Sequence, residues 1–445
     1  MRSRGGRFKR GSRMRRRPFR DRDTPRQPDR GRRARTPPRG YRPILPYHGR
    51  MRILILGGYG QFGGRISRTL AADAGFEILV AGRDGDRARR FIDASGVCGR
   101  TMRPLRLDAS DDAAVAQSFE QRRPDLVIHT AGPFQGQDCT PDGYRVARAA
   151  LRAGAHYIDL ADARAFVAGF AALEDEAKAA GRRAVSGASS VPGLSAAVIE
   201  AHLHRFTRLD AVEAGISPGN RTPRGLATTR AILGYVGRPY PALLHGRRRT
   251  VHGWQSLRRL GLPGLGTRWL ARCEVPDLDV LPARYPSLEH CDFRAGLELR
   301  RMHFGLWLGS WAVRARLLPS LQPWAGPLLR LSERWLDAGS DTGLMHVDMH
   351  GIGESGDALS LRWQMILRDG DGPQVPCTAA IVLARKLARG ALAGAGAGPC
   401  LDLFTLDEYL SALDGFAVET RTGELEHRRS GYQPGSRHPP GSSQP

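Results

Sequence analysis

Lysine and closely paired cysteines are scarce in this 445-residue sequence. Only Lys9, Lys178 and Lys386 occur, so a lysine is a poor candidate for a catalytic base in the folded part. The six cysteines form no Cys-x-x-Cys pair, which argues against a zinc site and against the disulfide framework of a small secreted protein. No uncharged apolar run reaches the roughly 18 residues that a transmembrane helix needs. We therefore expect a cytoplasmic protein with reduced thiols and no metal.

The net charge of +24 is concentrated in the N-terminal tail. Residues 1–50 contain 18 arginines and one lysine against three aspartates and no glutamate. Residues 1–48 and 421–445 are poor in large apolar side chains, so we predict that both are disordered tails. The arginines could bind nucleic-acid phosphates, but Met51 directly precedes the first strand, so translation from Met51 is an open alternative. For the rest of the chain we do not expect nucleic acid as a partner.

From Met51 onward, strand and helix signals alternate. Residues 52–56 form a short, almost entirely apolar run, which is typical of a parallel strand covered on both faces. Further strands are predicted at residues 77–81, 126–129, 156–160 and 183–186, with intervening helices that end at Gly154 and Gly181. This order predicts an α/β fold, with a Rossmann-type doubly wound parallel sheet over residues 51–205.

After residue 205 the alternation fades. Strand-like stretches at residues 211–217, 297–304, 344–350 and 361–367 predict a second, α+β sheet-containing domain over residues 206–420. Helices are expected near its C-terminal end, at residues 378–387 and 406–413. We expect this domain to cover one side of the cofactor cleft and to contribute to the substrate site.

Two features of the second domain leave alternatives open. The apolar stretch from Phe304 to Val313 is interpreted as a buried element or a substrate-site lining, with contact to a membrane surface as the alternative. His346, Asp348 and His350 would share one face of a strand, which suits a metal site or a half-exposed sheet face. We favour the second interpretation.

A glycine motif follows the first predicted strand and opens the first helix. It contains Gly58, Tyr59, Gly60, Gln61, Phe62 and Gly63. The first glycine permits a tight turn, the second lets the backbone approach a pyrophosphate, and the third lets helix and strand pack closely. The helix N-terminus then offers unpaired N–H groups to the phosphates. We predict that these six residues bind a dinucleotide.

The end of the second strand favours NADP over NAD. An NAD-dependent enzyme normally places an acidic residue there for the ribose hydroxyls, whereas this chain has Arg83 followed by Asp84. Arg83 can pair with a 2′-phosphate, and Arg87 is a second candidate; Asp84 keeps NAD open as the alternative. We place Asp108 beside the adenine, and Ala131, Gly132 and Pro133 beside the nicotinamide ribose.

Four segments resemble the saccharopine dehydrogenase-like oxidoreductases. They are residues 57–63, 131–134, 157–162 and 186–195, within a similar region that spans residues 51–203. The resemblance implies a Rossmann domain, a nicotinamide cofactor and a sheet domain that often mediates dimerisation, so we expect a homodimer. It does not imply that saccharopine is the substrate.

Residues near the strand ends are the candidates for proton transfer. Tyr157, Asp159 and Asp162 are predicted as catalytic residues, because the cofactor supplies hydride while the protein must supply a proton. The structural alternatives are a helix N-cap for Asp162 and a buried hydrogen bond for Asp159. The sequence thus predicts an NADPH-dependent reductase of an imine, ketone or activated C=C in a small-molecule substrate. A lipid-associated enoyl reductase and a non-catalytic NADP-binding sensor or scaffold are the alternatives.

Overall fold

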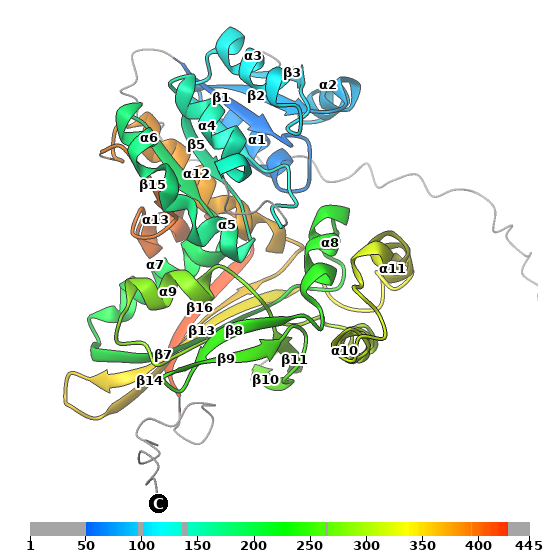
Figure 1. The fold of residues 1–445 in the computed structure, drawn as a ribbon, viewed down its shortest axis with the longest axis vertical. Helices are drawn as coiled ribbons and strands as arrows, with labels where there is room; N and C mark the ends of the chain where they lie inside the picture. The colour runs from blue at the N-terminus through cyan, green and yellow to red at the C-terminus, as the bar shows by residue number, and fades with distance from the viewer. Residues whose placement is uncertain (1–49, 97–100, 136–140, 263–265, 393, 426–445) are drawn as a thin grey trace, which may run out of the picture. The chain divides into compact units, whose positions relative to one another are not determined.

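The computed structural model describes residues 50–96, 101–135, 141–262, 266–392 and 394–425 (Figure 1). The predicted disordered tail at residues 1–48 lies outside these ranges, as do Cys98 and Cys139. The four described cysteines are buried and form no disulfide with one another.

The first sheet is parallel throughout and has the strand order β15-β6-β5-β4-β1-β2-β3. Its strands are β1 (Met51–Leu56), β2 (Phe76–Gly82), β3 (Met102–Arg106), β4 (Leu126–His129), β5 (His156–Asp159), β6 (Arg183–Ser186) and β15 (Gly396–Pro399). Its helices are α1 (Gly63–Ala71), α2 (Gly85–Asp93), α3 (Asp112–Arg122), α4 (Arg145–Arg152), α5 (Arg164–Ala168), α6 (Glu174–Ala179) and α7 (Ser195–Leu203). The apolar side chains of β1 and β4 are buried, as expected for central strands with helices on both faces. The predicted Rossmann fold is confirmed.

The C-terminal part of the chain returns to the first sheet. Strand β15 pairs in parallel with β6 at its edge, and α12 (Val375–Ala388) packs against α1. An ion pair between Arg385 of α12 and Asp73 fixes this contact. The predicted assignment of residues 206–420 to the second domain is therefore incomplete, because part of this range completes the first. That residue 205 separates two independently folding parts stays a prediction.

The second sheet is mixed and has the order β10-β11-β12-β7-β13-β14-β16, with β8 and β9 as a hairpin beside β12. Its strands are β7 (Phe206–Ser217), β8 (Pro239–Leu244), β9 (Arg247–His252), β10 (Arg258–Leu262), β11 (Gly266–Arg272), β12 (His290–Ala295), β13 (Gly343–Gly353), β14 (Ala358–Leu367) and β16 (Val418–Glu424). Its helices are α8 (Leu226–Tyr235), α9 (Asp277–Arg284), α10 (Arg300–Arg314) and α11 (Ala325–Glu333), and α13 (Leu406–Ser411) follows near the C-terminal end. The predicted second sheet-containing domain is confirmed as a fold.

Two details differ from the prediction. Residues 297–304 do not form a strand, because α10 begins at Arg300 and buries His303, Ser310 and Val313 on one face. Residues 421–424 are not disordered, because they extend β16 and pair with β14 through a complete backbone ladder. Residues 426–445 lie outside the described ranges.

Helices α8, α10 and α11 share a small core of their own, and Figure 1 shows them grouped beside the second sheet. Its buried members include Leu233 of α8, Val313 of α10 and Ala325 of α11. In the described parts of the chain, no helix combines the length and apolar character required to cross a bilayer.

Candidate functional site

A cavity of about 730 Å³ lies at the carboxyl ends of the parallel strands β1, β2 and β4. The glycine loop after β1 forms one wall, the segments after β2 and β3 form another, and residues 129–133 after β4 form a third. The first residues of α8 close the cavity from the second sheet, and Gln61 Nε2 donates a hydrogen bond to Pro223 O nearby. Both parts of the fold therefore contribute to one site, at the sheet edge where open α/β sheets bind ligands.

The glycine loop is shaped by close backbone contacts. Gly57 has a φ of +77°, and a Cβ atom on Gly63 would lie 2.3 Å from Gly57 O and 2.6 Å from Thr130 Oγ1. Gly60 N–H donates to Gly57 O at 2.8 Å, which closes the turn. Only glycine permits this approach of α1 to the strands.

The N-terminus of α1 is left without acceptors. Among the described residues, none accepts a hydrogen bond from the backbone N–H groups of Gln61, Phe62 or Gly63. No acidic side chain occupies the first turn of α1, and Phe62 provides no side-chain cap. Free N–H groups and the positive end of the helix dipole are the features through which helix N-termini bind anions.

The end of β2 carries basic side chains at the cavity wall. Arg83 and Arg87 line the cavity, and the Arg87 guanidinium lies 5.4 Å from the centre of the Tyr59 ring. Tyr59 lies across Gly82, where a Cβ atom would come within 2.4 Å of its ring, and its hydroxyl accepts a hydrogen bond from Asp84 N–H at 3.0 Å. Asp84 itself caps α2 by accepting from Arg87 N–H at 2.9 Å, and this bond lowers the pKa of its carboxyl. The acid that could serve NAD is thus engaged at a helix end.

The other predicted cofactor residues also meet at the cavity. Asp108 lines it, and hydrogen bonds from the N–H and hydroxyl of Ser110 lower the pKa of the Asp108 carboxyl. Ala131, Gly132 and Pro133 line the cavity opposite the glycine loop. Gly58 does not line it; its N–H donates to Ile55 O and Ala81 O, so its part is to hold the turn.

His129 is a residue of this site that the sequence did not single out. It ends β4, lines the cavity and is 4% exposed. Its Nδ1 lies 3.0 Å from the hydroxyl of Tyr157, while its Nε2 has no hydrogen-bond partner among the described residues. Burial lowers the pKa of His129 to about 4 and keeps the pKa of Tyr157 well above its ordinary value. Both groups are therefore neutral near pH 7, and one hydrogen bond joins them.

The two predicted catalytic aspartates do not line the cavity. Asp159 is fully buried behind Tyr157, where its Oδ1 accepts from Gly187 N–H at 2.8 Å, Ala161 N–H at 3.0 Å and the Ser186 hydroxyl. Burial raises the pKa of Asp159 to about 6. This geometry matches the structural alternative for that residue.

Asp162 has a different environment. It is exposed and accepts a hydrogen bond from Gln135 Nε2 at 2.8 Å. It is not an N-cap, because α5 begins at Arg164 and Ala163 holds the preceding position. A catalytic role for Asp159 or Asp162 stays a prediction.

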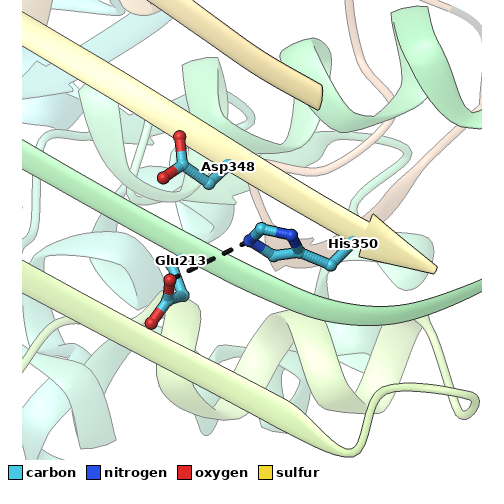
Figure 2. Close-up of side chains that lie close together, drawn as sticks. All are labelled: Glu213, Asp348 and His350. Atoms are coloured by element: carbon cyan, nitrogen blue, oxygen red, sulfur yellow. Dashed lines mark ion pairs between the residues drawn. The ribbon is translucent and has the colours of Figure 1, made fainter. Parts of the chain in front are cut away.

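A second group of polar side chains lies on the second sheet, at the place where the sequence suggested a shared strand face. Figure 2 shows Glu213, Asp348 and His350 close together on neighbouring strands, with His350 Nε2 3.9 Å from Glu213 Oε2. The expectation of a half-exposed face was wrong, because Asp348 is 1% exposed and His350 is fully buried. Strand β10 reaches over this face, since Arg258 contacts Glu213 from it.

Arginines compensate these buried acids. Arg258 donates to Glu213 at 2.6 Å, and Arg362 forms a two-pronged pair with Asp348 at 2.6 and 2.7 Å. The neighbouring His346 is also buried, and burial lowers its pKa to about 4. The carboxylates that a cation would need are therefore already neutralised, so the group is explained as a buried ion-pair network.

Known proteins resemble the part of the chain that contains this site. Residues 53–185 match the family described as Saccharopine dehydrogenase NADP binding domain. The polyketide synthase GfsA of Streptomyces halstedii is 36% identical over 129 residues, which cover 26% of this chain and 2% of that protein. The chain thus spans a very small part of that curated relative.

Solved structures resemble the fold over most of the chain. Apo saccharopine dehydrogenase (L-Glu forming) from Saccharomyces cerevisiae superposes with a TM-score of 0.59 at 14% identity, covering 84% of this chain and 100% of that one. A meso-dapdh mutant from Clostridium tetani gives a TM-score of 0.39 at 12% identity, covering 82% and 97%, and is too distant to support an argument. The family match supports an oxidoreductase-type domain with a nicotinamide dinucleotide cofactor. The chain therefore carries a saccharopine dehydrogenase-like NAD(P)-binding domain, as its sequence motifs indicated.

Proposed function

We propose that this protein is an NADP(H)-dependent oxidoreductase that transfers hydride to an imine, ketone or activated C=C of a small-molecule substrate. The observation that carries the proposal is the set of free backbone N–H groups of Gln61, Phe62 and Gly63, three residues that line a cavity of about 730 Å³. A pyrophosphate bound there would accept from the free N–H groups of α1. The adenosine half would then extend toward β2, and the nicotinamide half toward β4.

The end of β2 supports NADP as the cofactor. Arg83 and Arg87 are exposed side chains at the cavity wall, where a 2′-phosphate would lie. Asp84, which follows Arg83 directly, accepts a hydrogen bond from Arg87 N–H as the cap of α2. A guanidinium can bind a phosphate through two parallel hydrogen bonds, whereas the ribose hydroxyls of NAD are normally bound by an acidic residue at the strand end, where this chain has Arg83.

The side chains near β4 support a reduction. The cofactor supplies hydride when it is bound, and the protein must orient the acceptor and supply a proton. His129 and Tyr157 are the hydrogen-bonded polar side chains of the cavity wall near β4, with His129 Nδ1 3.0 Å from the Tyr157 hydroxyl. In the proposed arrangement His129 polarises the acceptor, Tyr157 positions His129, and Asp159 holds the backbone of residues 161 and 187 behind them.

The alternative of a lipid-associated enoyl reductase draws support from one side chain. Leu226 lines the cavity at the start of α8 and is 39% exposed, so an apolar group would meet it at the entrance. The reaction classes can be distinguished by testing acyl enones, ketones and cyclic imines as substrates. Oxidation of NADPH, measured by the loss of its absorbance, shows which of these compounds is reduced. Tight cofactor binding with no oxidation across the panel would favour the non-catalytic sensor instead.

A direct test of the leading proposal is calorimetric titration of the full chain with NADPH and NADH. We expect NADPH to bind with a dissociation constant at least about tenfold lower than NADH. Equal binding would refute the NADP preference, and no binding of either would refute the proposal. The homodimer implied by the family resemblance stays a prediction, which light scattering of the same sample checks.

A further inference from the structure

Exposed large apolar side chains gather on one part of the surface. Of the seven found among the described residues, five lie between residues 308 and 331. They are Leu308, Trp311, Leu317, Trp324 and Leu331, which we call the apolar patch. Leu317 is 76% exposed and Leu308 is 62% exposed, and exposed apolar side chains that gather in one segment mark an interaction surface.

The patch faces outward from a helical layer whose inner side is already packed. Helix α10 buries His303, Ser310 and Val313 against the small core, while Leu308 and Trp311 lie three residues apart on its other side. The remaining patch residues follow on the connection to α11 and on α11 itself, which Figure 1 shows beside α10. The exposed side chains of α10 therefore lie on the side of the helix away from the residues that it buries.

Basic side chains predominate in the segment that carries the patch. From Leu299 to Ser332 the chain contains no aspartate or glutamate, while five arginines fall within it: Arg300, Arg301, Arg314, Arg316 and Arg330. Arg314 lies 5.0 Å from the centre of the Trp311 ring, so a cation stands next to an exposed aromatic side chain. Tryptophan, leucine and arginine together are the side chains that favour the boundary between headgroups and acyl chains.

We propose that the apolar patch docks on the surface of an anionic lipid bilayer. Trp311 and Trp324 enter the interface, Leu308 and Leu317 bury their side chains among the first acyl carbons, and the arginines contact anionic headgroups. A second copy of this chain is a poorer occupant, because a symmetric contact through the patch would bring together the five arginines of each copy, against one acid, Glu333, at the end of α11. The inference concerns a surface outside the dinucleotide cavity and does not depend on the proposed reaction.

The test must separate the patch from the arginine-rich tail, which would attract anionic vesicles by itself. Full-length protein is mixed with vesicles of phosphatidylcholine, with or without phosphatidylglycerol, and part of the phosphatidylcholine carries bromine on its acyl chains. Bromine quenches tryptophan only at short range, so quenching reports insertion of the patch, whereas flotation reports any binding. We expect quenching with anionic vesicles and much less with phosphatidylcholine alone.

Three variants make the test specific. The double variant Leu308→Glu/Leu317→Glu should bind at least about tenfold more weakly and lose the quenching. Phe416→Glu is the matched control, because Phe416 is an exposed apolar residue (36%) outside the patch, and it should behave as the wild type. Trp311→Phe/Trp324→Phe should float with anionic vesicles like the wild type but lose most of the quenching.

Several outcomes would overturn the proposal. Flotation without quenching would show that the tail alone binds. Quenching that survives in both the double glutamate variant and the tryptophan variant would place the contact elsewhere. A change from dimer to monomer in the double glutamate variant without lipid, measured by light scattering, would identify a second copy as the occupant.

Discussion

Replacing Arg83 by alanine isolates the contact that distinguishes the two nicotinamide cofactors. Arg83 is exposed at the cavity wall and is not needed for packing, so the substitution should leave the fold intact. A charge-assisted hydrogen bond contributes about 1.5–3 kcal/mol, and we take the lower limit because Arg83 is exposed. Each 1.4 kcal/mol is a factor of ten in the dissociation constant, so Arg83→Ala should weaken NADPH binding about tenfold. Binding of NADH should change less than about twofold, because it lacks the 2′-phosphate.

The assay is calorimetric titration of each protein with both cofactors at one ionic strength. Arg89→Ala is the matched control, because Arg89 is also exposed, on α2, but pairs with Asp86 and does not line the cavity. The double variant Arg83→Ala/Arg87→Ala should lose about a hundredfold for NADPH if the two contacts act independently. Equal losses for NADPH and NADH in Arg83→Ala, or an equal loss in the control, would refute the assignment of this wall to the 2′-phosphate.

Three further predictions test the site and the core. Tyr157→Phe removes the 3.0 Å contact to His129 and should lower turnover about a hundredfold in any reduction that the wild type supports. The dissociation constant of NADPH should stay unchanged, and a parallel loss of NADPH affinity would contradict a positioning role for Tyr157. Gly63→Ala puts a methyl group 2.3 Å from Gly57 O, so it should abolish dinucleotide binding. It should also lower the free energy of unfolding, measured by chemical denaturation, by about 1–3 kcal/mol. Normal dinucleotide binding would contradict the loop geometry. Burial raises the pKa of Asp277 from 3.8 to about 7, so the folded state binds the proton more tightly than the unfolded state does. The stability of the folded state should therefore fall as the pH rises from about 4 to about 7. Asp277→Asn should therefore raise the free energy of unfolding at pH 8 by up to about 4 kcal/mol and have no effect near pH 3; a pH-independent effect would contradict burial of the carboxyl.

The features that could be predicted from the sequence are local in the chain. The turn at Gly57, the close contact at Gly63 and the basic end of β2 all depend on residues near one another in sequence, so spacing alone indicates them. Helix ends at Gly154 and Gly181 were predictable for the same reason, since both residues adopt positive φ values.

The features that could not be predicted depend on distant pairing. Strand β15 has the sequence Gly-Ala-Gly-Pro, which carries no strand signal; it becomes a strand because the free edge of β6 supplies the hydrogen bonds. His129 gained significance only when the fold brought it to Tyr157, 28 residues away. Its place at the end of a parallel strand was the available signal.

The buried ion-pair network on the second sheet also depends on residues that lie far apart in the sequence. Alternation along β13 correctly put Asp348 and His350 on one face. It could not show that Arg258, about 90 residues earlier in the chain, would cover and neutralise that face. Burial of a sheet face is decided by the element that packs on it, and no local pattern specifies that partner.

The central claim is that the backbone at the start of α1 binds a pyrophosphate, and a crystal structure of the full chain with NADP tests it most directly. The account predicts pyrophosphate oxygens within hydrogen-bond distance of the N–H groups of Gln61, Phe62 and Gly63, with the 2′-phosphate against Arg83. A dinucleotide bound elsewhere, or a loop whose N–H groups stay free while the cofactor is bound, would contradict it.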